Sequence, residues 1–347
     1  MIRVGLVGYG MAGRVFHAPV ISAVEGLELA AVVERHSRNA EAAYPGITTY
    51  TSLEEMLKDE SLRLIVVATP NTSHAPLAHQ ALAAGRHVVV DKPTGITASE
   101  IEGLIAATGP DRMLVPFHNR RFDSDFQTLR KLLREEKLGT IVSLESTFLR
   151  WRPAARGTWR DDGTDGGGIL LDLGTHLADQ AILLFGLPSE VSAEVTAERP
   201  GGKVNDSFNI RLYYQGKVVT LVANCLTALP RPRYTVRGTK GNFVKWGLDP
   251  QEDRLKETGK VEGSNWGVEP SSAWGTLSVD VDGSMVTHPV QPIPGDYRLY
   301  YAGVRDAILG IAAPPVLATD ALRVAQILEA AEQSWKESRT VTLNWSE

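Results

Sequence analysis

Six residues near the N-terminus constrain the fold more than any other feature: Gly8-Tyr9-Gly10-Met11-Ala12-Gly13. They follow the apolar run Ile2 to Val7, which predicts a strand, and they open a stretch with helical spacing. In that context the first glycine permits a tight turn, the second lets the backbone approach a pyrophosphate, and the third allows close helix-strand packing. The anion then lies at the helix N-terminus. The motif predicts a dinucleotide site, and the alternative is a glycine-rich turn without a ligand.

Short apolar runs alternate with amphipathic stretches over the first 120 residues. The runs predict strands at Ile2 to Val7, Leu27 to Val33, Leu62 to Ala68, His87 to Val90 and Met113 to Phe117. Continuous apolar runs suit strands covered on both faces, and strand-helix alternation predicts a parallel, doubly wound sheet. Such a sheet binds ligands at the C-terminal ends of its strands.

The pattern changes after Arg121. A helix-like stretch from Asp123 to Glu136 is followed by a long strand, and Ser207 to Tyr214 alternates apolar and polar residues, as in half-buried antiparallel sheet. A chain of 347 residues is too long for one ordinary core. We therefore predict an α/β domain at 1–120 and an α+β domain at 121–347; the helix-like segment from Asp320 to Lys336 could close either.

Bulk properties exclude several kinds of partner. A formal net charge of -5 and a pI near 6.0 give no general attraction for nucleic acid or for an anionic membrane. No apolar window approaches the roughly 18 residues that a membrane span needs, and the N-terminus shows no signal peptide. We expect a cytoplasmic protein. The one cysteine, Cys225, can form neither an internal disulfide nor a structural zinc site.

The residues after the second predicted strand bear on the choice of cofactor. Glu34 ends that strand, where a carboxylate would accept hydrogen bonds from the adenosine ribose and repel a 2′-phosphate. Arg35, Ser37 and Arg38 follow at once and could hold a 2′-phosphate if Glu34 turned away. The sequence leans slightly to NAD over NADP.

Asp91-Lys92-Pro93 stands directly after a predicted strand, at the sheet end where a nicotinamide would lie. The ammonium of Lys92 could orient an alcohol or polarise a carbonyl there. The alternative is a solvated surface lysine.

A second candidate cluster follows Gly166-Gly167-Gly168. Asp172 and His176 are four residues apart, a spacing that stacks them on one face of a helix, with Asp179 one turn further on. A histidine beside a carboxylate can act as a general acid or base near neutral pH. A polar stripe or a buried structural pair would give the same spacing. We predict no metal site, because a third ligand at a characteristic spacing is missing.

Taken together, these motifs resemble the glucose-fructose oxidoreductase and inositol dehydrogenase (Gfo/Idh/MocA) family over nearly the whole chain. The resemblance rests on the glycine motif, Thr69-Pro70-Asn71, Asp91-Lys92-Pro93 and the stretch ending in Asp172 and His176. The segments Phe117 to Asp123 and Gly247 to Glu252 resemble the bacterial branch that includes NADP-dependent scyllo-inositol dehydrogenases. The family's tripeptide usually begins with Glu, where this chain has Asp91, and NADP-using relatives tend to lack an acid at Glu34.

The resemblance implies a Rossmann domain followed by a domain with a large open mixed, mainly antiparallel sheet, and a homodimer or homotetramer. It implies that Lys92 and His176 flank the substrate carbon, with His176 as acid/base and Asp172 as its orienting or hydroxyl-binding partner. For the cofactor we expect contacts from Gly8, Tyr9, Gly10, Met11, Ala12, Glu34, Arg35, Thr69, Pro70, Asn71, His74, Asp91, Lys92 and Asn119. For the substrate we expect Asn119, Arg121, Trp159, Arg160, Asp172, His176 and Tyr234.

These expectations predict an NAD(P)-dependent dehydrogenase or reductase that acts on a secondary alcohol or ketone of a sugar or cyclitol. Two alternatives have the same fold. One is a dinucleotide-sensing regulator or binding protein without catalysis, against which the presence of Lys92, Asp172 and His176 argues. The other is a reductase for a non-sugar ligand such as an imine or a tetrapyrrole.

Overall fold

The computed structural model describes residues 1–155, 157, 161, 166–263 and 265–345. Backbone contacts divide the chain into two compact units, which we describe separately. The first unit comprises Met1–Phe122, Pro250–Trp266 and Asp296–Leu322, and the second comprises Asp123–Asp249, Gly267–Gly295 and Arg323–Glu347.

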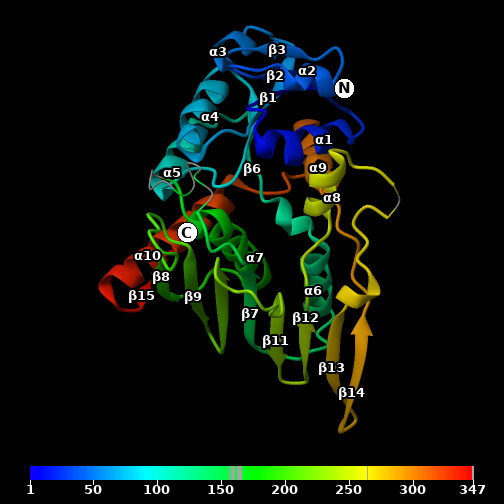
Figure 1. Ribbon diagram of the computed structural model, residues 1–347, viewed down its shortest axis with the longest axis vertical. Coiled ribbons are helices and arrows are strands. Elements are labelled where there is room, and N and C mark those ends of the chain that lie inside the picture. Colours follow the sequence, from blue (N-terminus) through cyan, green and yellow to red (C-terminus); the bar gives the residue numbers. More distant parts are fainter. Residues whose placement is uncertain (156, 158–160, 162–165, 264, 346–347) are drawn as a thin grey trace. The chain divides into compact units, whose positions relative to one another are not determined.

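A parallel sheet forms the centre of the first unit (Figure 1), as the sequence predicts. Its strand order is β3-β2-β1-β4-β5-β6, and every neighbouring pair is parallel. The strands are β1 (Ile2–Val7), β2 (Leu27–Val33), β3 (Thr48–Tyr50), β4 (Leu62–Val67), β5 (His87–Val90) and β6 (Leu114–Pro116). The chain leaves β1 in one direction and returns to its other side at β4. This reversal is the switch point at which such sheets bind ligands.

Both faces of this sheet are buried. Leu64 and Val66 of β4 join one apolar cluster, and Ile65 and Val67 join another. Alternate residues of one strand therefore point into different cores, which is why the sequence shows an unbroken apolar run. The helices of the unit are α1 (Ala18–Ser22), α2 (Asn39–Ala43), α3 (Leu53–Met56), α4 (His74–Ala83), α5 (Ala98–Ala107), α8 (Gln251–Thr258) and α9 (Arg298–Ile308).

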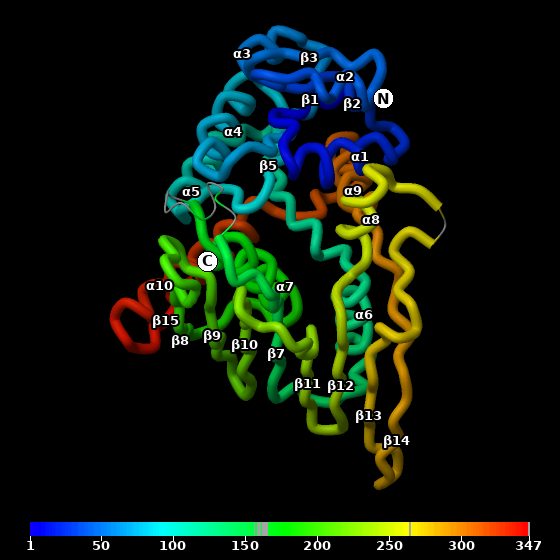
Figure 2. The backbone as a smooth tube through the Cα atoms, viewed as in Figure 1, coloured from blue at the N-terminus to red at the C-terminus, as the bar shows by residue number. Residues whose placement is uncertain are grey.

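Two late segments of the chain, 250–266 and 296–322, belong to the first unit. The sequence predicts instead that each domain is one uninterrupted stretch, with the boundary at residue 120. Leu255 of α8 and Tyr300 and Val304 of α9 are fully or almost fully buried in the same cluster as Val4 of β1. Figure 2 shows α9 beside α1, and α8 contacts the turn Gly13–His17 that precedes α1. Apolar spacing predicts that a helix has a buried face but does not indicate which sheet that face covers.

The second unit is built on a mixed sheet that is mostly antiparallel, again as predicted. Its order is β14-β13-β12-β11-β7-β10-β9-β8-β15, in which β7 and β10 pair in parallel. The strands are β7 (Ile141–Leu149), β8 (Glu190–Thr196), β9 (Ser207–Tyr214), β10 (Lys217–Asn224), β11 (Tyr234–Gly238), β12 (Gly241–Lys245), β13 (Gly275–Val281), β14 (Ser284–Val290) and β15 (Val341–Thr342).

Helices cover one face of this sheet. Phe126 of α6 (Ser124–Arg134), Leu177 of α7 (Thr175–Phe185) and Ile327 of α10 (Ala318–Glu337) join one cluster with Phe148 of β7 and Leu221 of β10. The sequence leaves open which domain the segment Asp320 to Lys336 would close, and its apolar residues Val324, Ile327 and Leu328 lie in this second core.

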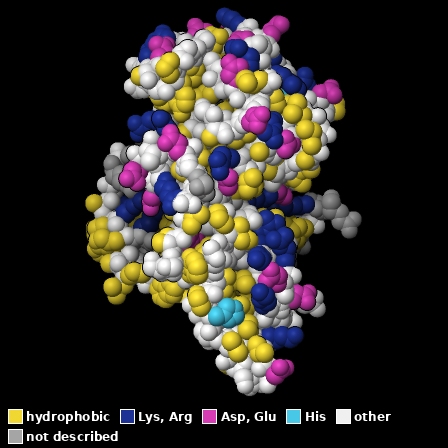
Figure 3. All heavy atoms as spheres, turned by 90° about the vertical axis from the view of Figure 1, so that its right-hand side faces the viewer, with side chains coloured by type: hydrophobic (Ala, Val, Ile, Leu, Met, Phe, Trp, Pro, Cys, Tyr) yellow, Lys and Arg dark blue, Asp and Glu magenta, His cyan; other side chains and the backbone are white. Residues whose placement is uncertain are grey.

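The surface carries charges of both signs. On the face shown in Figure 3, acidic side chains lie among the lysines and arginines, as on ordinary globular domains. None of the helices in the described residues combines the length and apolar character needed to cross a lipid bilayer.

Candidate functional site

The glycine motif fits a dinucleotide. Gly8 has φ +99°, and a Cβ there would lie 2.5 Å from the carbonyl oxygen of Ala68. A Cβ at Gly13 would lie 2.1 Å from the oxygen of Gly8, so this glycine permits the helix to pack against the turn. A Cβ at Gly10 would meet no heavy atom within 4 Å. Protein packing therefore accounts for two of the glycines, and the open space at Gly10 fits a phosphate close to the backbone.

The rest of the turn leads into a helix. Met11 is 47% exposed, Tyr9 is half-buried, and Ala12 precedes the π-helical turn Gly13–His17 that continues into α1. Burial, followed by the nearby charge of Glu34, raises the pKa of Tyr9, so its hydroxyl stays protonated. The helix N-terminus supplies the partial positive charge that favours an anion.

Glu34, the residue predicted to bind the adenosine ribose, is buried against its own loop. One carboxylate oxygen accepts a hydrogen bond from the Ser37 hydroxyl at 2.6 Å, and the other accepts from the backbone N–H of Ala40 at 2.8 Å. Only 7% of Glu34 is exposed, whereas Arg35 and Arg38 are exposed. The carboxylate thus closes the loop between β2 and α2.

The loops after β4 and β5 are joined by His74. Its Nδ1 lies 2.7 Å from the Pro93 carbonyl oxygen, and its Nε2 lies 2.8 Å from that of Thr69. His74 is fully buried at the start of α4. These contacts favour a structural role for His74, which holds the two loops together, rather than the predicted contact with the cofactor. Pro70 and Asn71 lie in the first of these loops, and Asn71 is 9% exposed.

Lys92 follows β5 at the C-terminal edge of the parallel sheet, and the peptide bond to Pro93 is cis. The Lys92 N–H donates to Asp91 Oδ1 at 2.8 Å, while the Asp91 N–H donates to the Val67 carbonyl at 2.9 Å. Burial raises the pKa of the Asp91 carboxyl, but the nearby imidazole of His17 and the charges of His74 and Lys92 outweigh burial, so the pKa is lowered. The short aspartate is therefore ionised and holds the lysine backbone.

Two residues after β6 were predicted to bind substrate. Asn119 is 5% exposed in the helical turn Asn119–Phe122. Arg121 forms an ion pair with Asp320 at 2.9 Å and donates to the Pro315 carbonyl at 3.3 Å. Through these partners, Arg121 joins the turn after β6 to the segment 296–322 within the first unit.

In the second unit, the glycine-rich stretch ends in a π-helical turn, Leu170–Gly174, followed directly by α7. Gly168 has φ +89°, and its ideal Cβ would lie 2.6 Å from Asn205 Oδ1. Asn205 accepts hydrogen bonds from the N–H groups of Ile169 and Leu170. Asn205 thus fixes the entry to the turn.

Asp172 lies in this π-helical turn and His176 lies in the first turn of α7. The stacking predicted from a four-residue spacing assumes α-helical geometry, and a π-turn shifts that register. Asp172 Oδ2 lies 3.5 Å from Arg150 Nη1, and 29% of the Asp172 side chain is exposed. His176 is 4% exposed, and Asp179 on the same helix is 2% exposed. π-turns are frequent at functional sites.

Tyr234 is buried rather than open to a ligand. Its side chain is 1% exposed, and its hydroxyl donates to Gln180 Oε1 at 2.9 Å and accepts from Arg233 Nη2 at 2.9 Å. Arg233 also pairs with Asp125 at 3.2 Å. This network favours a structural role for Tyr234. The other predicted substrate contacts, Trp159 and Arg160, lie outside the described residues.

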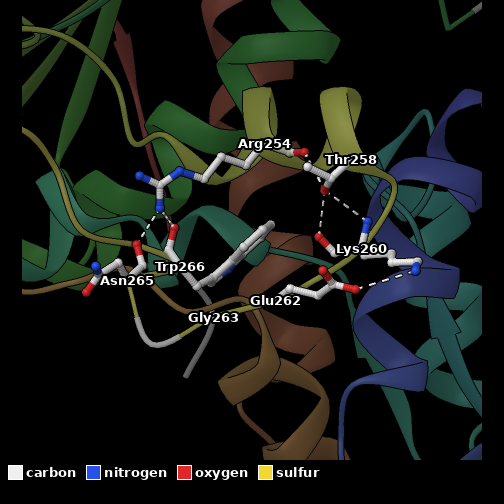
Figure 4. Close-up of a pocket in the computed structure, with 7 residues that line it drawn as sticks. All are labelled: Arg254, Thr258, Lys260, Glu262, Gly263, Asn265 and Trp266. Atoms are coloured by element: carbon white, nitrogen blue, oxygen red, sulfur yellow. Dashed lines mark hydrogen bonds and ion pairs between the residues drawn. The ribbon is translucent and has the colours of Figure 1, made fainter.

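A surface hollow of about 300 Å³ lies on the first unit, lined by residues of α8 and of the segment that follows it (Figure 4). The Arg254 guanidinium donates to the backbone carbonyls of Asn265 and Trp266. Lys260 Nζ lies 3.5 Å from Glu262 Oε1. The predicted site residues do not line it. We assign the hollow no part in catalysis.

The sequence did not indicate three polar residues whose contacts fix the segments that carry the predicted site residues. His17, Asn205 and Arg233 are all in contact with segments that carry predicted residues. A buried histidine or arginine leaves no periodic signal in a single sequence, since its burial depends on partners far away in the chain. Among the described residues, no group of three or more His, Cys, Asp or Glu is placed to hold a metal ion.

The parallel sheet and the glycine turn with open space at Gly10 define a dinucleotide-binding fold. Family comparison agrees. Residues 2–111 match the NAD-binding Rossmann fold of the Gfo/Idh/MocA oxidoreductase family, and residues 130–343 match that family's C-terminal alpha/beta domain. The chain belongs to this family.

Individual relatives match over nearly their full length. The uncharacterized oxidoreductase YdgJ of Escherichia coli is 42% identical, with 99% of each chain covered. The scyllo-inositol 2-dehydrogenase (NADP(+)) IolW of Bacillus subtilis is 34% identical, with 99% of this chain and 96% of that protein covered. The solved structure of YvaA from Bacillus subtilis has a TM-score of 0.96 at 33% identity, covering 99% of this chain and 98% of that one.

Proposed function

We propose that this protein is an NAD(P)-dependent dehydrogenase or reductase that interconverts a secondary alcohol and a ketone of a sugar or cyclitol. One observation carries the proposal: Lys92 lies at the ligand-binding edge of the parallel sheet, one strand beyond the switch point, on a backbone fixed by Asp91. A solvated surface lysine would not need this support. The name of the relative IolW, an inositol dehydrogenase, supports a polyol substrate.

The two candidate sites divide the chemistry. In the oxidative direction, His176 takes the hydroxyl proton and the Lys92 ammonium stabilises the negative charge that develops on the oxygen. A nicotinamide dinucleotide held at the glycine turn would supply the acceptor for the substrate's hydride. Asp172 accepts a hydrogen bond from a substrate hydroxyl or orients the imidazole. Reduction follows the same steps in reverse.

The test is to mix the protein with NAD or NADP and a panel of inositols and sugars while following absorbance of the reduced nicotinamide. We expect turnover with a polyol, and we expect His176→Ala to lower kcat by about 10²–10⁴-fold while cofactor affinity is retained. Asp179→Asn, a change to a buried neighbour on α7, shows whether any polar substitution on this helix has the same effect. Cofactor binding without turnover across the panel would support the regulatory alternative.

For the cofactor, we propose that NADP is preferred, against the slight lean of the sequence to NAD. Both oxygens of Glu34 already accept hydrogen bonds from its own loop, and Arg35 beside it is exposed. An exposed guanidinium can hold a 2′-phosphate through charge-assisted hydrogen bonds. The NADP(+) in the name of IolW agrees with this choice.

The dissociation constants of NADPH and NADH test this choice. They are measured by adding each nucleotide to the protein and following the tryptophan fluorescence. We expect tighter binding of NADPH, and we expect Arg35→Ser to weaken NADPH binding by about tenfold or more without changing NADH binding, since a hydrogen bond to a charged group contributes about 1.5–3 kcal/mol. Tighter binding of NADH that Glu34→Gln abolishes would restore the NAD assignment.

A further inference from the structure

His17 is a buried histidine to which neither the dinucleotide motif nor the proposed chemistry gives a role. It ends the π-helical turn Gly13–His17 and is 0% exposed. Its ring lies 4.1 Å from the ring of Phe117, centroid to centroid, within the apolar core of the first unit. Burying an imidazole among apolar side chains costs free energy unless its nitrogens have polar partners. Both of its nitrogens face polar groups.

Tyr301 is the first of these partners. Its hydroxyl oxygen lies 2.6 Å from His17 Nδ1. Burial, followed by the charges of Tyr300 and Asp91, raises the pKa of Tyr301 well above its ordinary value, so the phenol keeps its proton. A neutral imidazole that accepts this proton at Nδ1 carries its own hydrogen on Nε2.

Asp91 is the second partner. His17 Nε2 lies 3.7 Å from Asp91 Oδ2. A bare Nε2 would turn its lone pair toward an ionised carboxylate, which is unfavourable, so the proton on Nε2 agrees with the bond to Tyr301. The imidazole therefore presents a positive edge to the carboxylate.

The other oxygen of that carboxylate holds the backbone of Lys92. Asp91 Oδ1 accepts a hydrogen bond from the Lys92 N–H at 2.8 Å. His74 Nδ1 lies 2.7 Å from the carbonyl oxygen of Pro93, the residue after Lys92. The chain of contacts runs from Tyr301 through His17 and Asp91 to Lys92, and all four residues belong to the first unit.

From these contacts we infer that His17, held by Tyr301, is a positioning residue that fixes Asp91 and through it the direction of Lys92. The inference rests on the proposed function for its kinetic consequence, but the position of Lys92 can be measured without turnover. A purely structural His17 would change stability alone.

The experiment compares His17→Leu, which removes both polar contacts, with His17→Gln, whose amide N–H can replace Nε2–H. His79→Gln, on the exposed surface of α4, is the matched control. The first measurement is the ¹³C NMR signal of reductively methylated Lys92, assigned by its loss in Lys92→Arg. The second is kcat, together with the dissociation constant of NADPH.

We expect His17→Leu to shift the Lys92 signal and to lower kcat by about 10–100-fold, because small misplacements of catalytic groups cost this much. The dissociation constant should stay within about twofold, and His17→Gln should restore most of both properties. If His17→Leu does not fold, Tyr301→Phe, which removes the bond to Nδ1, gives the same readouts. A folded variant with an unchanged Lys92 signal would overturn the inference. Absence of polyol turnover in the unaltered protein would overturn only the proposed function.

Discussion

Tyr234 donates its hydroxyl hydrogen to Gln180 Oε1 at 2.9 Å and thereby joins β11 to α7, the helix that carries His176. Gln180 lies one helical turn beyond His176. The same amide oxygen accepts from Arg233 Nη2 at 2.8 Å, so a buried charge contributes to the orientation of α7.

Tyr234→Phe is therefore expected to affect stability rather than substrate binding. Removal of the hydroxyl leaves Gln180 and Arg233 each with one partner fewer, at a cost of about 1–3 kcal/mol in the free energy of unfolding. Urea denaturation measures this loss, and Tyr213→Phe, whose hydroxyl bonds Ser192 on a half-buried part of the sheet, is the control. A raised KM for polyol with unchanged stability would restore the substrate-binding role predicted from the sequence.

The glycine turn permits a sharper comparison, because its glycines serve different purposes. Gly10→Ala should leave stability unchanged within about 1 kcal/mol but weaken dinucleotide binding by tenfold or more, because the new methyl group occupies open space next to the turn. Gly13→Ala should destabilise the fold by about 1–3 kcal/mol, because its methyl would lie 2.1 Å from a backbone oxygen. Thermal unfolding and NADPH titration of both variants check the two predictions. Equal loss of binding and stability in both would contradict them.

The fold was predictable from the sequence where a single physical signal dominates. The run Leu64 to Val67 is apolar throughout because both faces of β4 are covered. The strand Thr48–Tyr50 was missed, since three residues without an apolar run give no such signal.

The candidate sites were predictable only in outline. Strand ends locate Lys92 correctly at the sheet edge, but the direction of a side chain depends on its own loop. Glu34 illustrates this: the hydroxyl of Ser37 and the N–H of Ala40 draw the carboxylate inward, although the motif predicts an outward contact with ribose. The π-turn at Asp172 is a second example, because apolar spacing does not distinguish it from an α-turn.

Cys225 offers a simple check of the second core. The thiol is 8% exposed, and burial raises its pKa despite the nearby Arg199. Because the thiolate is the reactive form, we expect a disulfide reagent at pH 8 to modify the native protein slower by on the order of tenfold or more than the protein unfolded in guanidinium. Equal rates would contradict the burial of this residue at the end of β10.

The ion pair between Arg120 and Glu252 makes stability depend on pH. Burial raises the pKa of the Glu252 carboxyl, but Arg120 and Lys256 outweigh it, so the pKa falls to about 2 from an ordinary 4.5. A carboxyl with a lowered folded-state pKa stabilises the fold fully above pH 4.5 and loses that contribution as the pH falls toward 2. Glu252→Gln should therefore lower the free energy of unfolding at pH 7 by about 2–3 kcal/mol, and the difference from the unaltered protein should shrink between pH 4.5 and the acid limit of folding.

Urea unfolding from pH 7 to pH 3 measures this trend. Asp253→Asn on the same helix is the control, because that side chain is 90% exposed and lies 3.9 Å from Lys256, so its pair should contribute less than about 1 kcal/mol at any pH. Arg120→Met tests the other partner: it leaves Glu252 half-buried beside Lys256 alone, and the carboxyl should then titrate closer to its ordinary pKa. A pH-independent difference between Glu252→Gln and the unaltered protein would show that the pair acts through packing rather than through charge.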